Sequence, residues 1–159
     1  MEVRKTRLEE LELVMDIYHR AQDIMAERGN PSQWGHFYPT RAMIEDDILK
    51  GRSYVLMDKE QILGVFMLLS GADPSYSYIE DGEWPNDEEY VTIHRIASSG
   101  IEKGVFRGAF DYARSICSNV RVDTHKDNIA MQAAIEKCGF KRCGVIYVDD
   151  GTPRIAYHS

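Results

Sequence analysis

The sequence has 159 residues, of which 43% are apolar, and this suits one domain with a single hydrophobic core. It contains 26 acidic and 19 basic residues, for a formal net charge of −7. This excess of negative charge argues against a general surface for nucleic acid or for anionic membranes, and it favours a cationic small molecule as the partner. We therefore treat residues 1–159 as one domain that binds neither nucleic acid nor membrane.

The cysteines and the first residues indicate the compartment. Cys117, Cys138 and Cys143 are odd in number and have no CxxC or Cys/His spacing. They support neither a disulfide framework nor a zinc site, so we expect reduced, mostly buried thiols and no metal. The opening residues, MEVRKTRLEELELV, contain no apolar core of signal-peptide length, and no later segment approaches a membrane span. We expect a cytoplasmic protein.

The first half of the chain predicts a strand, two helices and a hairpin. Thr6 followed by Glu9 has the spacing of a capping box, and apolar residues then recur at helical intervals up to Gly29. The predicted elements are a strand over 2–4, a helix from Thr6 to Gly29, a helix over 39–50, and a hairpin of strands 53–57 and 61–70. Residues 72–89 are rich in Pro, Gly and acids and predict a long loop, which in a compact domain is often functional.

The second half of the chain alternates strands with helices. Asn128 can cap a helix, and Gly139 can end it. The predicted elements are a strand over 90–97, a helix over 104–118, a strand over 119–124, a helix from Asn128 to Gly139, and strands over 143–148 and 154–157. An early meander followed by strand-helix alternation predicts an α/β domain with a mixed sheet.

Residues 90–140 resemble the acetyl-CoA-binding half of acetyltransferases of the GNAT superfamily. The segment His94-Arg95-Ile96-Ala97 resembles the family's fourth strand, and Lys103-Gly104-Val105 resembles its pyrophosphate loop. Asn128 to Phe140 resembles the helix written N…EK-x-GF. The resemblance implies a single-domain mixed β-sheet flanked by helices, whose central strands splay apart and bind CoA. It also implies an N-acetyltransferase that moves an acetyl group from its cosubstrate acetyl-CoA to an amine by direct attack, and a homodimer.

Two positions depart from the family pattern. The loop is usually Q/R-x-x-G-x-G/A, whereas residues 101–106 read IEKGVF and keep one glycine. The tyrosine that often stands four residues before the Gly-Phe glycine, and acts as an acid toward the CoA thiolate, is Ile135 here. These departures leave a second function open, which is a non-catalytic acetyl-CoA-binding or sensor domain on the same fold.

The resemblance also assigns the cofactor contacts. The free N–H groups and dipole at the start of the Gly104 helix suit a pyrophosphate, and Lys103 adds charge. In the family, pantetheine amides pair with the edge of the fourth strand, where a backbone amide polarises the thioester carbonyl. The predicted cofactor-binding residues are Ile96, Ala97, Ser98, Lys103, Gly104, Val105 and Asn128. The alternatives are that the glycines only shape a loop and that Asn128 only caps its helix.

Direct transfer needs an unprotonated amine, so a nearby group must help to remove its proton. His125 directly follows the strand over 119–124, with Asp123 and Asp127 beside it, and His94 lies in the strand before. We predict His125 and His94 as the catalytic candidates, and an ordinary hydrogen-bonded side chain is the alternative for each. A thiol-dependent transferase would need a Cys-His-acid arrangement, which the cysteine spacing does not show.

The acceptor site is predicted from charge and aromatic residues. No Lys or Arg lies between Glu60 and His94, whereas acids and aromatic residues alternate in the loop over 72–89. Aromatic faces with carboxylates suit an ammonium group, and the resemblance places the helix-helix loop beside the acceptor. The predicted substrate-binding residues are Trp34, Tyr38, Trp84, Glu88 and Glu89. They would serve a small-molecule amine or a peptide amine; the alternative is that the tryptophans only pack the loops onto the body.

Overall fold

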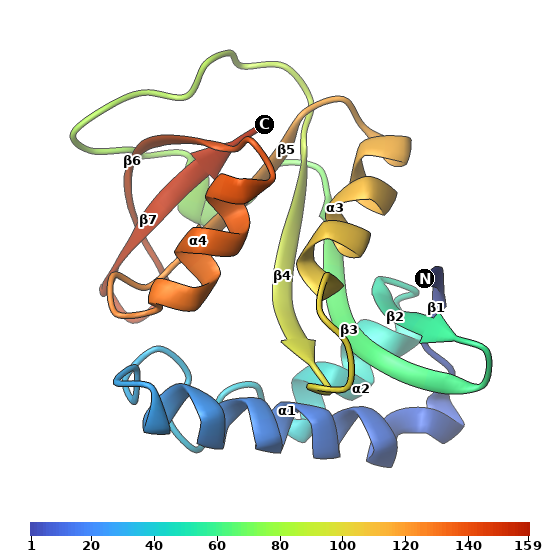
Figure 1. Ribbon diagram of the computed structural model, residues 1–159. Coiled ribbons are helices and arrows are strands. Elements are labelled where there is room, and N and C mark those ends of the chain that lie inside the picture. Colours follow the sequence, from blue (N-terminus) through green and yellow to red (C-terminus); the bar gives the residue numbers. More distant parts are fainter.

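A seven-stranded mixed sheet runs through the computed structural model, which describes residues 1–159 (Figure 1). The strands are β1 (Glu2–Lys5), β2 (Ser53–Asp58), β3 (Gln61–Ser70), β4 (Val91–Ser98), β5 (Val120–Thr124), β6 (Lys141–Tyr147) and β7 (Pro153–His158). Their spatial order is β1-β2-β3-β4-β5-β7-β6, and only β4 and β5 are parallel. The predicted α/β class with a mixed sheet is confirmed.

Four α-helices flank the sheet. They are α1 (Leu11–Glu27), α2 (Arg41–Leu49), α3 (Val105–Ile116) and α4 (Ile129–Lys137), and two short 3-10 helices are η1 (Leu8–Glu10) and η2 (Pro74–Tyr76). Most predicted elements are confirmed, with ends that differ by about two residues or fewer, as is usual for helix and strand termini. The exception is the start of the first helix.

The capping box predicted at Thr6 and Glu9 is wrong. The Thr6 hydroxyl forms a hydrogen bond with Ser53 Oγ at 2.8 Å, and the Thr6 N–H donates to the Ser53 carbonyl at 2.9 Å. These bonds extend the pairing of β1 with β2 and keep Thr6 beside the sheet. The helical turn begins later, where the Glu10 carboxylate accepts the backbone N–H of Arg7 at 2.8 Å.

Two hydrophobic cores lie on opposite faces of the sheet. Leu56 packs in the core that α3 and α4 cover, whereas its neighbours Val55 and Met57 pack in the core beneath α1 and α2. This division follows from the alternation of side chains along a strand. A small third core forms where the β3–β4 loop covers β6 and β7 through Tyr76, Ile146 and Ala156. Figure 1 shows that β4 runs from the end of the sheet near this loop toward α1.

The cysteines are free and partly buried, and none of them is fully enclosed. Cys117 and Cys138 lie at the ends of α3 and α4, and Cys143 lies in the edge strand β6, where neighbouring side chains cover a residue only in part. Burial raises the pKa of the Cys143 thiol, which therefore stays protonated at neutral pH.

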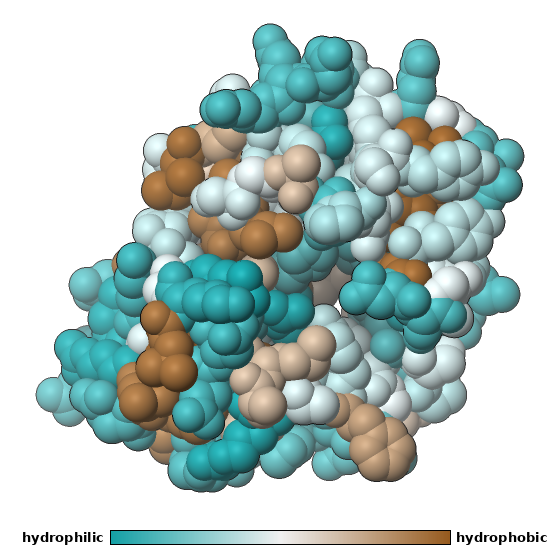
Figure 2. Space-filling view, turned by 180° about the vertical axis from the view of Figure 1, so that it is seen from behind, coloured by the Kyte–Doolittle hydropathy of each residue, from teal (hydrophilic) through white to brown (hydrophobic).

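The surface is mostly polar. Figure 2 shows hydrophilic residues over most of the face opposite that of Figure 1, with hydrophobic residues in small separate groups. None of the helices is both long enough and apolar enough to span a membrane. No group of three or more His, Cys, Asp or Glu side chains is arranged to hold a metal ion.

Candidate active site

The strands β4 and β5 pair at only two positions. Val91 lies opposite Val120, and Thr92 lies opposite Arg121, in parallel register. Beyond them, β4 continues to Ser98 without a partner on its β5 side. The predicted splay of the central strands is therefore confirmed, and it leaves a free backbone edge on the second half of β4.

A β-bulge distorts β4 in this unpaired half. Arg95 and Ile96 together lie opposite Phe66, the single β3 residue between two regular pairs. Arg95 has a φ of 47°, in the left-handed region that residues other than glycine rarely adopt. Such backbone strain persists only where the surrounding contacts hold it in place.

A buried ion pair holds the bulge. Arg95 Nε and Nη2 donate to the Asp47 carboxylate of α2 at 2.9 and 2.8 Å, and Nη1 donates to the Tyr38 hydroxyl at 3.0 Å. The Tyr18 hydroxyl of α1 donates to the Arg95 carbonyl at 2.7 Å. Burial opposes the charge of Arg95, but the bonds to Asp47 and Tyr38 outweigh it and raise the pKa of the guanidinium. The helices α1 and α2 thus fix the bulge from one face of the sheet.

The loop after β4 enters α3 at Gly104, which has a φ of 90°. No side chain caps this helix, so the N–H groups of its first turn have no partner. A Cβ on Gly64 would lie 2.6 Å from Val105 Cγ1, so the glycine lets the start of α3 pack directly on β3. Lys103 is exposed beside this helix start, whereas the side chain of Val105 is buried. The arrangement suits an anionic group.

The predicted cofactor residues of β4 can act only through backbone or through a hydroxyl. The side chain of Ile96 packs in the core with α3, and that of Ala97 packs in the core with α1. Ser98 Oγ accepts the N–H of Gly100 at 3.1 Å and so shapes the following loop.

A polar cluster lies where β4 and β5 separate, on the face opposite α3. His94 Nε2 lies 2.6 Å from Asp73 Oδ2 of the β3–β4 loop. The Tyr76 hydroxyl donates to Asp123 of β5 at 2.6 Å, and its ring centroid is 6.3 Å from that of His94. A histidine on β4 and a carboxylate on β5 are thereby connected across the strands by one loop.

Burial and hydrogen bonding fix the protonation states of this cluster. Burial, with the charge of Asp123, raises the pKa of Tyr76 well above its usual value, so the phenol stays protonated and donates. Burial acts to raise the pKa of Asp73, but the hydrogen bond and charge of His94 outweigh it and lower that pKa. Asp73 therefore stays ionised and accepts a hydrogen bond from the Nε2–H group of His94.

His125 lies in a second hydrogen-bond network, between β5 and the α1–α2 loop. Its Nδ1 accepts the Asp127 N–H at 3.0 Å, and its Nε2 lies 3.3 Å from Ser32 Oγ. Burial and the charge of Arg154 lower the pKa of His125, so the ring is neutral at physiological pH. The two predicted catalytic histidines share no hydrogen-bond partner.

Asn128 caps α4, as one of its two predicted roles requires. Its Oδ1 accepts the Met131 N–H at 3.1 Å, and its Nδ2 donates to Gln33 Oε1 at 3.0 Å. The second bond connects the start of α4 with the α1–α2 loop. A cofactor contact by Asn128 stays a prediction.

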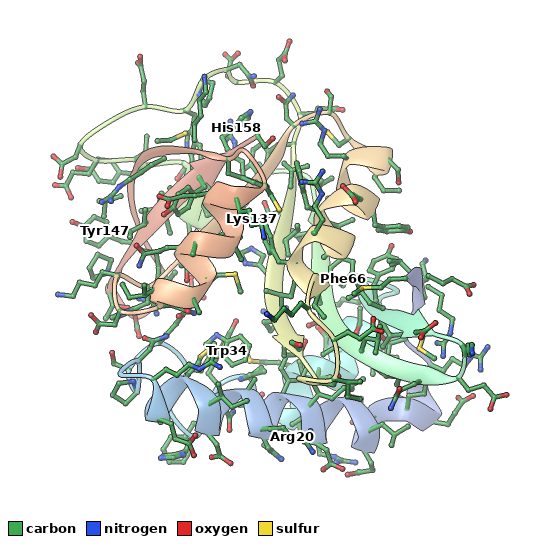
Figure 3. All side chains as sticks on the ribbon, in the orientation of Figure 1. Arg20, Trp34, Phe66, Lys137, Tyr147 and His158 are labelled. Carbon is green, nitrogen blue, oxygen red and sulfur yellow. The ribbon has the colours of Figure 1, made fainter.

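The structure does not bring the predicted substrate residues together. Trp34 is 9% exposed and packs against Tyr18, with ring centroids 5.9 Å apart. It therefore packs its loop onto the body, which was the alternative role for this residue. Figure 3 shows Trp34 beside α1, at the end of β4 that approaches this helix. Tyr38, from the same loop, bonds to Arg95 at this end.

Trp84, Glu88 and Glu89 lie at the other end of β4, where it pairs with β5. The guanidinium of Arg121 lies 4.1 Å from the centre of the Trp84 ring and bonds to His158, which Figure 3 shows at the end of the sheet far from α1. The guanidinium of Arg121 thus covers the face of Trp84 that was predicted to bind an ammonium group. The path of the β3–β4 loop, which sequence patterns do not fix, causes this separation.

Two hollows in the protein are large enough for a small molecule. The larger, of 710 Å³, lies between α1 and the β2–β3 turn and has charged residues of both signs. The smaller, of 530 Å³, lies beneath the β3–β4 loop, and we call it the loop pocket; its lining includes Asp73, Tyr76, Trp84, Tyr90 and Arg121. Of these two hollows, the loop pocket is the one that reaches the His94–Asp73 pair, through Asp73.

Solved structures share this fold. An acetyltransferase of the GNAT family from Streptococcus agalactiae 2603 has a TM-score of 0.88 and 28% identity, covering 99% of this chain and 94% of that one. A GNAT-family acetyltransferase from Listeria monocytogenes 4b F2365 has a TM-score of 0.71 and 17% identity, covering 99% and 93%. The aminoglycoside acetyltransferase AAC(6′)-Ib, in complex with coenzyme A and kanamycin, has a TM-score of 0.65 and 18% identity, covering 99% and 92%. No protein-family model and no curated protein matches the sequence.

The seven-stranded sheet with its separated central strands is the fold of these acetyltransferases. The chain has the fold of the acetyltransferases of the GNAT superfamily. The resemblance stated from residues 90–140 is confirmed, and acetyltransferase activity is the function that this likeness supports.

Proposed function

We propose that the protein is an acetyl-CoA-dependent N-acetyltransferase that acts on an amine by direct attack. The observation that carries the proposal is the free edge of β4 beside the His94–Asp73 pair, at the point where β4 and β5 separate. One of the structures with this fold is a complex with coenzyme A, which supports the same type of ligand here.

The residues present fit acetyl-CoA. The free backbone of β4 from Ile96 to Ser98 can pair with pantetheine amides, and the first turn of α3 with Lys103 can hold the pyrophosphate. A Cβ on Gly100 would meet no atom within 4 Å, so the loop is open at this residue, and a Cβ on Gly104 would meet only Met1 Cε, at 3.7 Å. Asn128 is the further proposed contact. When bound, acetyl-CoA supplies a thioester whose carbonyl carbon accepts the amine nitrogen and whose sulfur leaves as the thiolate.

We assign the proton transfer to His94. Since the ionised carboxylate of Asp73 can only accept, Nε2 of His94 carries a proton, and in the neutral form of the ring Nδ1 holds the free lone pair. Nδ1, which has no hydrogen-bond partner in the protein, takes the proton from the amine. Asp73 stabilises the imidazolium that results. His125 is the second candidate, and its lone pair on Nδ1 is already used by the Asp127 N–H.

The test combines binding with turnover. Acetyl-CoA at ~100 Kd should raise the free energy of unfolding by roughly 2.7 kcal/mol, because it binds the folded chain only. Thermal unfolding with and without acetyl-CoA measures this, and a CoA-release assay over chemically diverse amines measures turnover. A melting temperature that does not respond to saturating acetyl-CoA would contradict the proposal.

A non-catalytic acetyl-CoA sensor on the same fold is the second candidate. It is favoured by Ile135, which is fully buried at the position where the family often has an acidic tyrosine. Acetyl-CoA binding without CoA release over the whole amine panel would support this function instead.

A further inference from the structure

Arg121 is a buried cation without an acidic partner. It is 3% exposed, and it takes part in no ion pair of the structure. Its Nε donates to His158 Nδ1 at 3.2 Å, and its Nη2 donates to the Asn86 carbonyl at 2.9 Å. Burial and the charge of Arg121 lower the pKa of His158, so this histidine is neutral and adds no charge.

One nitrogen of this guanidinium is free. Nη1 has no hydrogen-bond partner, and it is not among the enclosed polar atoms that lack one. Arg121 is one of the residues that line the loop pocket. Nε uses its single N–H and Nη2 uses one of its two, so Nη1 and the second N–H of Nη2 are the positions at which an anion can bind.

The guanidinium of Arg121 packs between two aromatic rings. Arg121 Cζ lies 4.1 Å from the centre of the Trp84 ring and 3.9 Å from that of Tyr90. These contacts offset part of the cost of burial. Burial still lowers the pKa of Arg121, and a buried charge is stable only when it is hydrogen-bonded or paired. The rings cover the faces of the guanidinium and leave its Nη1–Nη2 edge, through which a carboxylate can bind.

Tyr90 connects this cation with the His94–Asp73 pair. Its ring lies against Arg121, and its hydroxyl accepts the Asp73 N–H at 2.8 Å. Asp73 and Arg121 both line the loop pocket. A group that can bind a carboxylate therefore lies one tyrosine away from a carboxylate and an imidazole that can receive an amine.

We propose that the loop pocket binds an acceptor that carries both an amine and a carboxylate, namely an α-amino acid, with its carboxylate on Arg121 and its amine at the His94–Asp73 pair. This inference rests on the proposed function. The volume of 530 Å³ lies in the range of small-molecule sites. The exposed acids Asp87 and Glu88 attract the ammonium group, whereas an amine without a carboxylate leaves Arg121 unpaired. The acceptor is thus zwitterionic rather than simply cationic.

Steady-state kinetics at saturating acetyl-CoA tests the proposal. The KM of an amino-acid amide should exceed that of the parent amino acid by about 10- to 100-fold, the usual effect of a hydrogen bond to a charged group. Arg121→Gln should raise the KM of the acid by a similar factor and leave that of the amide nearly unchanged. Arg114→Gln is the matched control, because Arg114 also lies over a ring, that of Phe110 at 5.7 Å, but outside the pocket.

Equal KM values for acid and amide in the wild type, or a preference for spermidine, would overturn the inference. The proposed acetyltransferase function would still stand in that case, because CoA release would show turnover. If no amine is acetylated, titration with N-acetyl-amino acids decides, because binding them needs no chemistry. The wild type should bind them, and their methyl esters should bind at least 10-fold more weakly; absence of binding overturns the inference. Arg121→Lys keeps the charge without the planar guanidinium, so its KM for the amino acid should lie between those of the wild type and Arg121→Gln. If neither variant folds, the KM values of acid and amide in the wild type still decide.

Discussion

His94 has the two properties that a base at this site needs. Its Nε2 is fixed at 2.6 Å from an ionised carboxylate, and its side chain is 23% exposed, so a ligand can reach the ring. His125 is less accessible, with a side chain 12% exposed. Since the carboxylate of Asp73 also stabilises the protonated ring, His94 can hold the proton until it returns to solvent.

Replacement of His94 tests this assignment. His94→Gln should lower kcat by about 10²- to 10⁴-fold, the usual contribution of a general base, and should leave the Kd of acetyl-CoA unchanged. Asp73→Asn should lower kcat less, because the imidazole remains. His19→Gln, on the exposed face of α1, is the control. If His125→Gln removes turnover and His94→Gln does not, the base is His125.

The lowered pKa of Asp73 predicts a pH dependence of stability. A carboxyl with a lower pKa in the folded state contributes stability that is complete above its unfolded pKa, roughly 3.9, and is lost as the pH falls through the folded value. The difference in unfolding free energy between the wild type and Asp73→Asn should therefore be constant near neutral pH and shrink below about pH 4. Urea unfolding from pH 3 to 7 measures it; a difference independent of pH would show that Asp73 is not held as an anion.

At the scale of elements, α2 determines the shape of β4. Asp47 is 1% exposed and accepts hydrogen bonds from Arg95 and from Arg52, so one carboxylate connects α2 with the bulge and with the start of β2. The ion pair therefore acts on the strand that would present the thioester, although neither side chain needs to contact acetyl-CoA.

Asp47→Asn should lower the free energy of unfolding by roughly 3–5 kcal/mol, the usual cost of removing one partner of a buried ion pair. Asp46→Asn, next in sequence, is the control: its half-exposed carboxylate pairs with Lys50, so its loss should cost only about 0–1 kcal/mol. Urea unfolding of both variants gives the comparison. Equal effects would mean that Arg95 finds another partner.

Features set by neighbouring residues were predictable from the sequence, and features set by loop paths were not. Asn128 and Gly139 start and end α4 through local hydrogen bonds and a φ of 86°, so the sequence alone locates this helix. Its place in a strand identifies His94 as a site residue, whereas the sequence shows its partner Asp73 only as one acid in an acidic loop. No spacing rule relates them, because the packing of the β3–β4 loop on the sheet brings them together. For the same reason the sequence does not reveal that Trp34 and Trp84 lie at different ends of β4.

At the scale of the whole molecule, the sheet consists of two parts joined at β4 and β5. Two residue pairs are the only pairing between these strands, whereas every other neighbouring pair of strands has at least four. A ligand that pairs with the free edge of β4 would therefore add backbone hydrogen bonds where the sheet has fewest.

Hydrogen exchange of the whole chain should localise acetyl-CoA. Saturating acetyl-CoA should slow exchange in the second half of β4 and in the first turn of α3, because a bound ligand shields these amides, and should change β2 and β3 little. ADP alone should protect the α3 turn but not β4, since it carries the pyrophosphate without pantetheine. If protection instead appears along α1 and the β2–β3 turn, acetyl-CoA binds in the 710 Å³ hollow, and the separation of β4 from β5 is not its site.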